Sequence, residues 1–420
     1  MTKEFCDLLH LFRCAVHGEE AEPISSDAES VLKLAERQGV WTVVFPVVKK
    51  LYEKDSSILS AEKIAKYDRR FINNISIELR RKIAVRSMLG MLEKEGIKCC
   101  ILKGEILAEL YAVPETRISS DTDILLENPD LEEKVCDIME KHGFDVMARP
   151  STSNHAMCRS AATGLVEFHL TMHDELMEDV WFNKLNEKNE PTRRHVPTDG
   201  GEITTLGYTD GAVFVALHFI KHFLSAGVGI RQLMDVLLYI RQYRNEIDQK
   251  RFNQIMKDLK YDRFLKTCAK IGEKFLGIKA EEIFEFCEDK GFSPDEDLIC
   301  AVLSDIEDGG LFGHDDEKRE EFYKLYTEAR FARFKDGSYD EYMKNWGHVP
   351  VLKRLFPSYR AMQAEYRILK KHPSLLPFMY AHRIGKKMFG ITKGDVKIKP
   401  YKTMGKDRER LEMIKKLDMI

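Results

Sequence analysis

The pattern of apolar and polar residues is helical at the start of the chain. Apolar residues recur at steps of three and four over residues 26–37, 41–53 and 64–92, the period of amphipathic helices. Gly96 follows the last stretch, where a left-handed residue commonly ends a helix. Residues 1–96 are therefore predicted to form an N-terminal helical segment. In its longest helix the predicted apolar face is Ile64, Tyr67, Phe71, Ile75, Leu79 and Ile83, drifting to Val85, Leu89 and Leu92.

Short apolar runs bounded by turn residues replace this pattern over residues 97–180. Runs of this length and composition are typical of β-strands. A helical turn at 105–111 and an apolar helical stripe from Leu131 to Met139 lie between them. We predict a compact α/β unit with a small mixed sheet. Its strands are expected at 97–102, 118–126, 144–148, 156–160 and 165–171.

The helical period returns in the second half of the chain. Residues 200–350 are predicted to form a helical domain, larger than the α/β unit, with an acidic, glycine-containing loop from Asp305 to Gly313. Residues 351–420 are predicted to form a basic helical tail. The fold class that follows is α+β, because the strands are segregated into one short part of a mainly helical chain.

Charge is distributed unevenly along the 420 residues. Residues 351–420 carry 18 Lys and Arg against 6 Asp and Glu, a net charge of +12. The remainder carries 48 against 63, a net charge of −15. Opposite charges indicate either that the tail docks on the body or that it presents a basic surface to an acidic partner. Docking is favoured, because the tail is also rich in apolar residues.

Composition excludes several classes of protein. Apolar residues make up 44% and charged residues 32% of the chain, which is typical of globular domains and excludes collagen-like or wholly disordered chains. No apolar run is long enough to span a bilayer, and the N-terminus does not resemble a secretory signal. The nine cysteines form no CxxC pair, so we expect free thiols and a cytoplasmic location.

Three short motifs of the α/β unit combine into one chemical pattern. Lys103-Gly104 ends the first predicted strand, Asp121-Thr122-Asp123 begins the second, and Glu167-Phe168-His169 lies in a later strand. Residues two apart in a strand point to the same face. Asp121 would therefore project with Asp123, and Glu167 with His169. If the two strands are neighbours, three carboxylates converge on one spot.

Converging carboxylates repel one another unless a cation offsets their charge. Oxygen ligands of this kind suit Mg²⁺ or Mn²⁺, and ions placed there would stabilise an in-line phosphoryl transfer. Lys103 and Arg117 are cations that would neutralise phosphate oxygens. Each motif also has an ordinary reading, the two aspartates as a solvated turn and Glu167 with His169 as a surface pair. Their order within one small unit is what favours a metal-dependent nucleotidyl transfer site.

The run LKGEILAELYAVPETRISSDTDILL, followed by VEFHLTM, resembles the nucleotidyltransferase superfamily of DNA polymerase β type. It is most similar to a bacterial branch of uncharacterised nucleotidyltransferases, which have LKG, an arginine four residues before the first aspartate, and an E-x-H strand. The resemblance implies a polymerase-β-like core in which Asp121, Asp123 and Glu167 are catalytic and bind the metal. It also implies that Gly104 contacts the triphosphate. Thr122 and Glu105 depart from the family pattern, where a bulky aliphatic residue and a serine are usual.

Two further pairs lie in the predicted helical domain. His218 and His222 are four apart and share a helix face. They are predicted either to contact base, phosphate or acceptor at the nucleotide cleft, or to pack at a domain boundary. Arg231 and Asp235 are also four apart, and a structural ion pair is the favoured interpretation.

The function predicted is transfer of a nucleoside monophosphate from a nucleoside triphosphate to a hydroxyl of a small molecule or protein, with release of pyrophosphate. The site residues comprise the three carboxylates together with Lys103, Gly104, Arg117, His169, His218 and His222. The alternative is a catalytically degenerate nucleotide-binding or protein-interaction (antitoxin-like) module, which the departures at Thr122 and Glu105 leave open. No recognisable RNA- or DNA-reading motif is present, which argues against a nucleic-acid partner. The sequence does not determine the oligomeric state.

Overall fold

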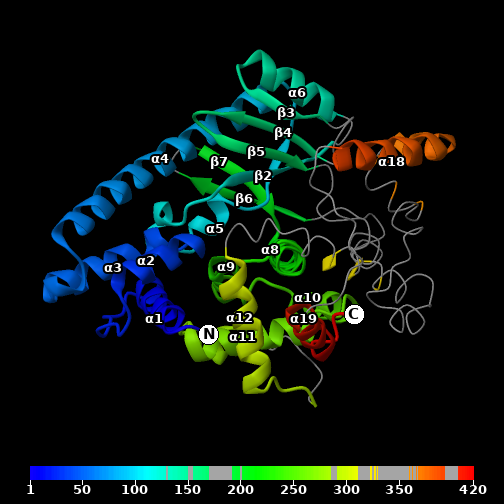
Figure 1. Ribbon diagram of the computed structural model, residues 1–420. Helices are drawn as coiled ribbons and strands as arrows, with labels where there is room; N and C mark the ends of the chain where they lie inside the picture. The colour runs from blue at the N-terminus through cyan, green and yellow to red at the C-terminus, as the bar shows by residue number, and fades with distance from the viewer. Residues whose placement is uncertain are drawn as a thin grey trace.

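The computed structural model describes residues 1–128, 131–149, 155–169, 192–198, 201–284, 291–310, 368–392 and 405–420, with a few single positions between 322 and 366. It is an α+β fold, as predicted, with one seven-stranded mixed sheet and a larger set of helices. Figure 1 shows the sheet at one end of the molecule and helices α8 to α12 below it. The strands are β1 Cys99–Ile101, β2 Asp121–Leu126, β3 Asp145–Ala148, β4 His155–Ser160, β5 Gly164–His169, β6 Arg193–Thr198 and β7 Gly201–Leu206.

Strand β2 lies at the centre of the sheet, whose order is β3-β4-β5-β2-β1-β7-β6. It pairs in parallel with β5 from Asp121, opposite Leu165, to Leu125, opposite His169. On its other side it pairs antiparallel with β1. Two strands that the sequence placed far apart are therefore direct neighbours, which is the condition on which convergence of the carboxylates depended.

One face of the sheet is covered by two helices, α4 (Ala61–Lys94) and α6 (Glu132–Lys141). A closed hydrophobic core joins Ile124, Val166 and Phe168 of the sheet to side chains of both helices. In a strand, alternate residues face opposite sides, so this packing turns Asp121, Asp123 and Glu167 to the other face. The core thus fixes which way the acidic residues point.

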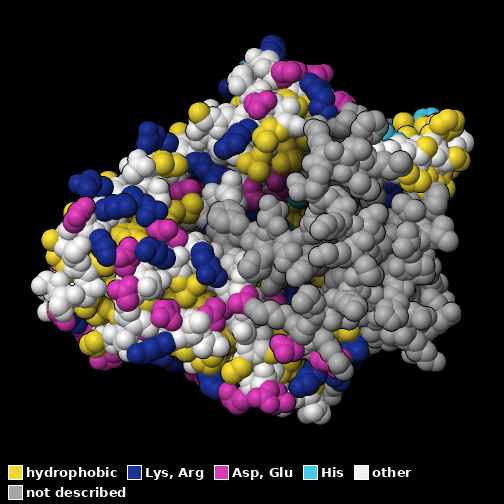
Figure 2. All heavy atoms as spheres, in the orientation of Figure 1, with side chains coloured by type: hydrophobic (Ala, Val, Ile, Leu, Met, Phe, Trp, Pro, Cys, Tyr) yellow, Lys and Arg dark blue, Asp and Glu magenta, His cyan; other side chains and the backbone are white. Residues whose placement is uncertain are grey.

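Helix α4 has 34 residues and is about 51 Å long. Its first half packs Ile64 and Tyr67 against α3 (Trp41–Lys54), and its second half packs Val85 and Leu92 against the sheet. The predicted continuous apolar face is wrong in the middle, where Leu79 and Ile83 are exposed. The reason is that the helix changes partner, so the buried face rotates between its two ends. Figure 2 shows Lys and Arg side chains gathered along this helix.

A second, larger core joins helices from both ends of the chain. Residues of α1–α3 pack in the same cluster as residues of α8–α12, and Gln38 donates to the Ile306 and Glu307 carbonyls. Helices α1–α3 and the described helices between residues 208 and 309 therefore share one core. Residues of this core lie on α1 Lys3–His17, α2 Ala28–Arg37, α3 Trp41–Lys54, α5 Glu105–Ala108, α8 Tyr208–Leu224, α9 Ile230–Gln242, α10 Gln249–Asp258, α11 Asp262–Phe275 and α12 Glu296–Gly309.

The sheet extends beyond the predicted boundary at residue 180. The hairpin β6–β7 joins its edge through β7, where Thr205 pairs in parallel with Ile101 of β1. The sequence around the turn, VPTDGGEITTL, alternates in character and contains a glycine turn, a hairpin signal that the prediction missed. The sheet therefore includes β6 and β7, which lie beyond that boundary.

Two predictions about the second half of the chain are decided by packing. The prediction of an acidic loop is wrong for residues 305–309, because these residues complete helix α12. The chain leaves the helix at Gly310, with φ +62°. The end of the basic tail docks on the body. Helix α19 (Gly405–Lys416) buries Leu411 and Ile414 in the large core, and Arg410 pairs with Asp305 at 3.1 Å. Helices α17 (Ile368–Lys371) and α18 (Leu376–Thr392) precede it.

Eight of the nine cysteines fall in the described part of the chain, and each is a free thiol. None of the described helices is long and apolar enough to cross a membrane.

Candidate active site

The parallel pairing of β2 with β5 places the acidic motifs side by side. Asp123 lies opposite Glu167 in the register, and alternation puts Asp121 and His169 on the same face as this pair. His169 Nε2 donates a hydrogen bond to Asp123 Oδ1 at 2.8 Å and lies 3.8 Å from Glu167 Oε2. The Asp123 side chain is only 2% exposed, and those of Asp121 and Glu167 are 24% and 21% exposed. The four residues that the sequence assigned to one face are together.

Lys103 reaches into this cluster from the turn after β1. Its Nζ lies 2.9 Å from Asp123 Oδ2 and 3.4 Å from Asp121 Oδ2. His218 of α8 lies on its other side, with Nε2 2.9 Å from the same Nζ. An ammonium group donates only, so His218 accepts through an unprotonated Nε2. Helix α8 therefore contributes directly to the site.

Charge and burial shift the pKa values of these groups in different directions. Burial disfavours the Asp123 carboxylate, but the nearby Lys103 and His169 outweigh it and hold its pKa well below the ordinary value. Burial, followed by the charges of Asp123 and Asp121, raises the pKa of Glu167. Burial opposes the charge of Lys103, yet the two aspartates raise its pKa. The site thus contains an ion pair between Lys103 and Asp123. Beside it lies Glu167, whose ionised form is disfavoured by burial and by the neighbouring aspartates.

The chemistry of the donor set fits a divalent cation. Among the described residues, Asp123, Glu167 and His169 each offer a ligand atom, and these atoms lie within 4.8 Å of one another. Carboxylate oxygens are hard ligands that suit Mg²⁺ or Mn²⁺, and Mn²⁺ also accepts an imidazole nitrogen. A cation there would offset the repulsion that raises the pKa of Glu167.

Gly104 forms the turn between Lys103 and α5, with φ +81° and ψ −103°. This conformation is costly for any residue that carries a Cβ atom, so the sequence requires glycine there. Arg117 Nη1 donates to the Gly104 carbonyl at 3.4 Å and to Ser119 Oγ at 2.9 Å. The turn is therefore held from behind by a buried arginine.

The main partner of Arg117 is Asp235 of α9, and sequence reasoning missed this pair. Its Nε and Nη2 each lie 2.8 Å from the Asp235 carboxylate, and Tyr111 also donates to that carboxylate at 2.9 Å. The predicted pairing of Asp235 with Arg231 four residues away is replaced by a contact across 118 positions of the chain. The predicted contact of Arg117 with a phosphate has no support from this geometry, because its guanidinium is directed to α9.

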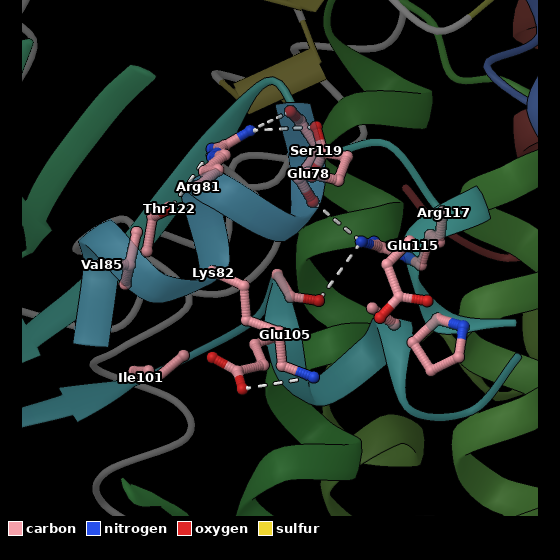
Figure 3. Close-up of a pocket in the computed structure, with 13 residues that line it drawn as sticks. Glu78, Arg81, Lys82, Val85, Ile101, Glu105, Glu115, Arg117, Ser119 and Thr122 are labelled. Carbon is pink, nitrogen blue, oxygen red and sulfur yellow. Dashed lines mark hydrogen bonds and ion pairs between the residues drawn. The ribbon is translucent and has the colours of Figure 1, made fainter. Parts of the chain in front are cut away.

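The two departures from the family pattern face away from the carboxylates. Glu105 accepts from Arg86 Nε of α4 at 2.9 Å and lies 3.8 Å from Lys82 Nζ. Thr122 accepts from Arg81 Nη2 at 3.2 Å. Both side chains line a cavity of about 60 Å³ behind the turn, and Figure 3 shows them there. The Glu105 carboxylate is therefore neutralised by α4 and does not oppose an anion at the turn.

His222 lies one helical turn beyond His218, and the two rings meet edge to face with centroids 4.5 Å apart. Burial and then Lys103 lower the pKa of His222 to about 4. Arg231 of α9 donates to the Ile118 carbonyl, in the segment that leads into β2. His222 thus lies behind His218, and Arg231 supports the backbone before the first aspartate.

Comparisons with known proteins identify one family and two solved structures with partial similarity. The sequence profile of a family described as uncharacterised nucleotidyltransferase matches residues 25–277, more than half of the chain. The chain is similar to an antigenic nucleotidyltransferase-like protein from Paracoccidioides brasiliensis, at 14% identity over 48% of this chain and 93% of that chain, with a TM-score of 0.31. It is also similar to a tRNA nucleotidyltransferase solved with a primer tRNA and an incoming ATP analog, at 14% identity over 72% and 99% of the two chains, with a TM-score of 0.21. No curated protein matches.

Proposed function

The chain belongs to the uncharacterised nucleotidyltransferase family, and from this premise we propose that it moves a nucleoside monophosphate from a nucleoside triphosphate to a hydroxyl of a small molecule or protein. The observation that carries the proposal is the register of β2 with β5, which puts Asp123 opposite Glu167 with Asp121 on the same face. The Gly104 turn stands at the same end of the sheet, where its backbone can approach a triphosphate.

A divalent cation, Mg²⁺ or Mn²⁺, would be held by Asp123 and Glu167 with His169 or Asp121, and would supply charge stabilisation for the phosphates. The residues of the chain do the rest. The acceptor hydroxyl oxygen forms a bond to the α-phosphorus, the bond from that phosphorus to the bridging oxygen breaks, and pyrophosphate leaves. Glu167, whose pKa is raised by burial and its acidic neighbours, takes the hydroxyl proton. Holding both reactants in line accounts for much of the rate acceleration.

Titration calorimetry with ATP, GTP, CTP and UTP, each with and without Mg²⁺, tests the proposal. We expect Mg²⁺-dependent binding of at least one triphosphate that is lost in Asp123→Asn. The control is Asp137→Asn, a carboxylate that is 71% exposed on α6 and should leave binding unchanged. Binding of no triphosphate, or binding that survives Asp123→Asn, would sink the proposal.

Release of pyrophosphate separates a transferase from the alternative, a degenerate nucleotide-binding or antitoxin-like module. We expect labelled nucleoside monophosphate to appear on an acceptor, with pyrophosphate formed in equal amount. Triphosphate binding without pyrophosphate release, across candidate acceptors that include hydroxyl-bearing side chains, would instead favour the degenerate module. A bacterial origin and a cytoplasmic location remain part of the same proposal.

A further inference from the structure

The ammonium group of Lys103 lies within the carboxylate cluster, where protein side chains surround it. Lys103 Nζ donates a hydrogen bond to Asp121 Oδ2 at 3.4 Å and another to His218 Nε2 at 2.9 Å. It also forms an ion pair with Asp123 Oδ2 at 2.9 Å, a buried oxygen that accepts no hydrogen bond from the described residues. Its side chain is 13% exposed. The ammonium is therefore held between the two aspartates and His218 and is not directed outward toward solvent or a phosphate.

The cluster has two positions for positive charge, and Lys103 fills one of them. It sits between the two aspartates, each of which gives it one oxygen. The other position lies among Asp123, Glu167 and His169, whose ligand atoms are within 4.8 Å of one another. Asp123 takes part in both, because its Oδ2 faces Lys103 and its Oδ1 faces His169.

Charge balance agrees with this division. Three ionised carboxylates carry three negative charges, and Lys103 offsets one of them. The remaining two match one divalent cation. A second divalent ion between Asp121 and Asp123 would have to displace the ammonium and leave it buried without its partners, which is costly.

We propose that Lys103 takes the place of the second divalent ion, so that the site binds a single cation among Asp123, Glu167 and His169. The inference rests on the proposed function and deepens it, because it says how many divalent ions the three carboxylates of this phosphoryl-transfer site bind. Lys103 is a positioning residue that orients both aspartates, and His218 fixes the ammonium between them.

Mn²⁺ alone, titrated into nucleotide-free protein and followed by electron paramagnetic resonance, counts the ions. We expect one bound Mn²⁺ per chain in the unaltered protein and two in Lys103→Met, since the substitution vacates the position between the aspartates. The control is Lys82→Met, which removes a lysine that pairs with Glu105 and Glu109 on the far side of the turn. It should bind one ion.

Each other count has a distinct meaning. No bound Mn²⁺ in the unaltered protein overturns the proposed metal site itself. Two ions in the unaltered protein, or one in Lys103→Met, overturns the role of Lys103 and leaves the proposed function standing. Should Lys103→Met fail to fold, Asp121→Asn still decides. We expect it to keep one ion at little-changed affinity, whereas a fall of about tenfold or more would make Asp121 a ligand and refute the inference.

Discussion

Arg117 and Asp235 form a buried pair that connects helix α9 to the candidate site. Among such contacts, the loss of this pair has the clearest consequence for stability. Their side chains are 3% and 4% exposed, and two hydrogen bonds of 2.8 Å join them. Replacing Asp235 with asparagine removes the negative charge. In one of the two orientations of the asparagine amide, its N–H₂ group points toward the guanidinium of Arg117. The hydroxyl of Tyr111, which donates to the same carboxylate at 2.9 Å, competes for the one oxygen that remains.

The magnitude follows from burial, because an arginine that is nearly inaccessible cannot recover its lost partner from water. Removing one member of a buried pair costs about 3–5 kcal/mol of the free energy of unfolding. A matched exposed pair should cost far less. Lys270 and Glu273 of α11 lie 2.6 Å apart with side chains 48% and 43% exposed, and Glu273→Gln is expected to cost about 1 kcal/mol or less.

Urea unfolding followed by circular dichroism measures both costs. A third variant, Arg117→Met with Asp235→Leu, removes both charges and should recover most of the stability lost in Asp235→Asn, since apolar replacement of a whole buried pair is often tolerated. If Asp235→Asn lowers the free energy of unfolding by less than about 1 kcal/mol, the cost is no more than that of an exposed pair and the reasoning is refuted. A double variant no more stable than the single one would refute it as well.

Three further expectations concern the turn and its surroundings. Gly104→Ala should cost about 1–3 kcal/mol of unfolding free energy, because φ +81° is strained for alanine; an unchanged urea midpoint would contradict this. Glu105→Gln should cost about 1–3 kcal/mol, because it weakens the partner of Arg86, yet leave triphosphate affinity unchanged in calorimetry; tighter binding would mean that the carboxylate does oppose the phosphates. The pKa of His222 is lowered to about 4 from 6.5, so the folded state disfavours its charged form. The contribution of neutral His222 to stability is therefore fully present above pH 6.5 and is lost as the pH falls toward 4. The urea midpoint of His222→Gln should depend less steeply on pH over that window than the midpoint of the unaltered protein.

The local parts of the site could be predicted from the sequence. Alternation in a strand is a property of adjacent residues, so Asp121 with Asp123, and Glu167 with His169, were assigned to common faces, and the structure has them there. Strands β1 to β5 and the family were also predicted, because both depend on short runs of residue types, whereas the hairpin β6–β7 was missed. The glycine turn was likewise visible as Lys-Gly between a strand and a helix.

The partners of these residues could not be predicted, because no local pattern specifies which distant segments meet. Lys103 was expected to neutralise phosphate and instead contacts two aspartates and His218, which is 115 positions away. Arg117 pairs with Asp235 across 118 positions. In the same way, Leu79 lies on the predicted apolar face of α4 and is exposed, since that helix passes from one core to the other.

Sequence alone therefore determined five strands of the sheet (β1 to β5), the fold class and the family, because periodicity and motif spacing are encoded in neighbouring residues. The tertiary structure alone decided that β2 and β5 are adjacent, that β7 extends the sheet, and that a lysine lies between the aspartates. The physical reason is that these arrangements depend on burying two separate hydrophobic faces at once. The charged groups take the partners which that packing brings within reach.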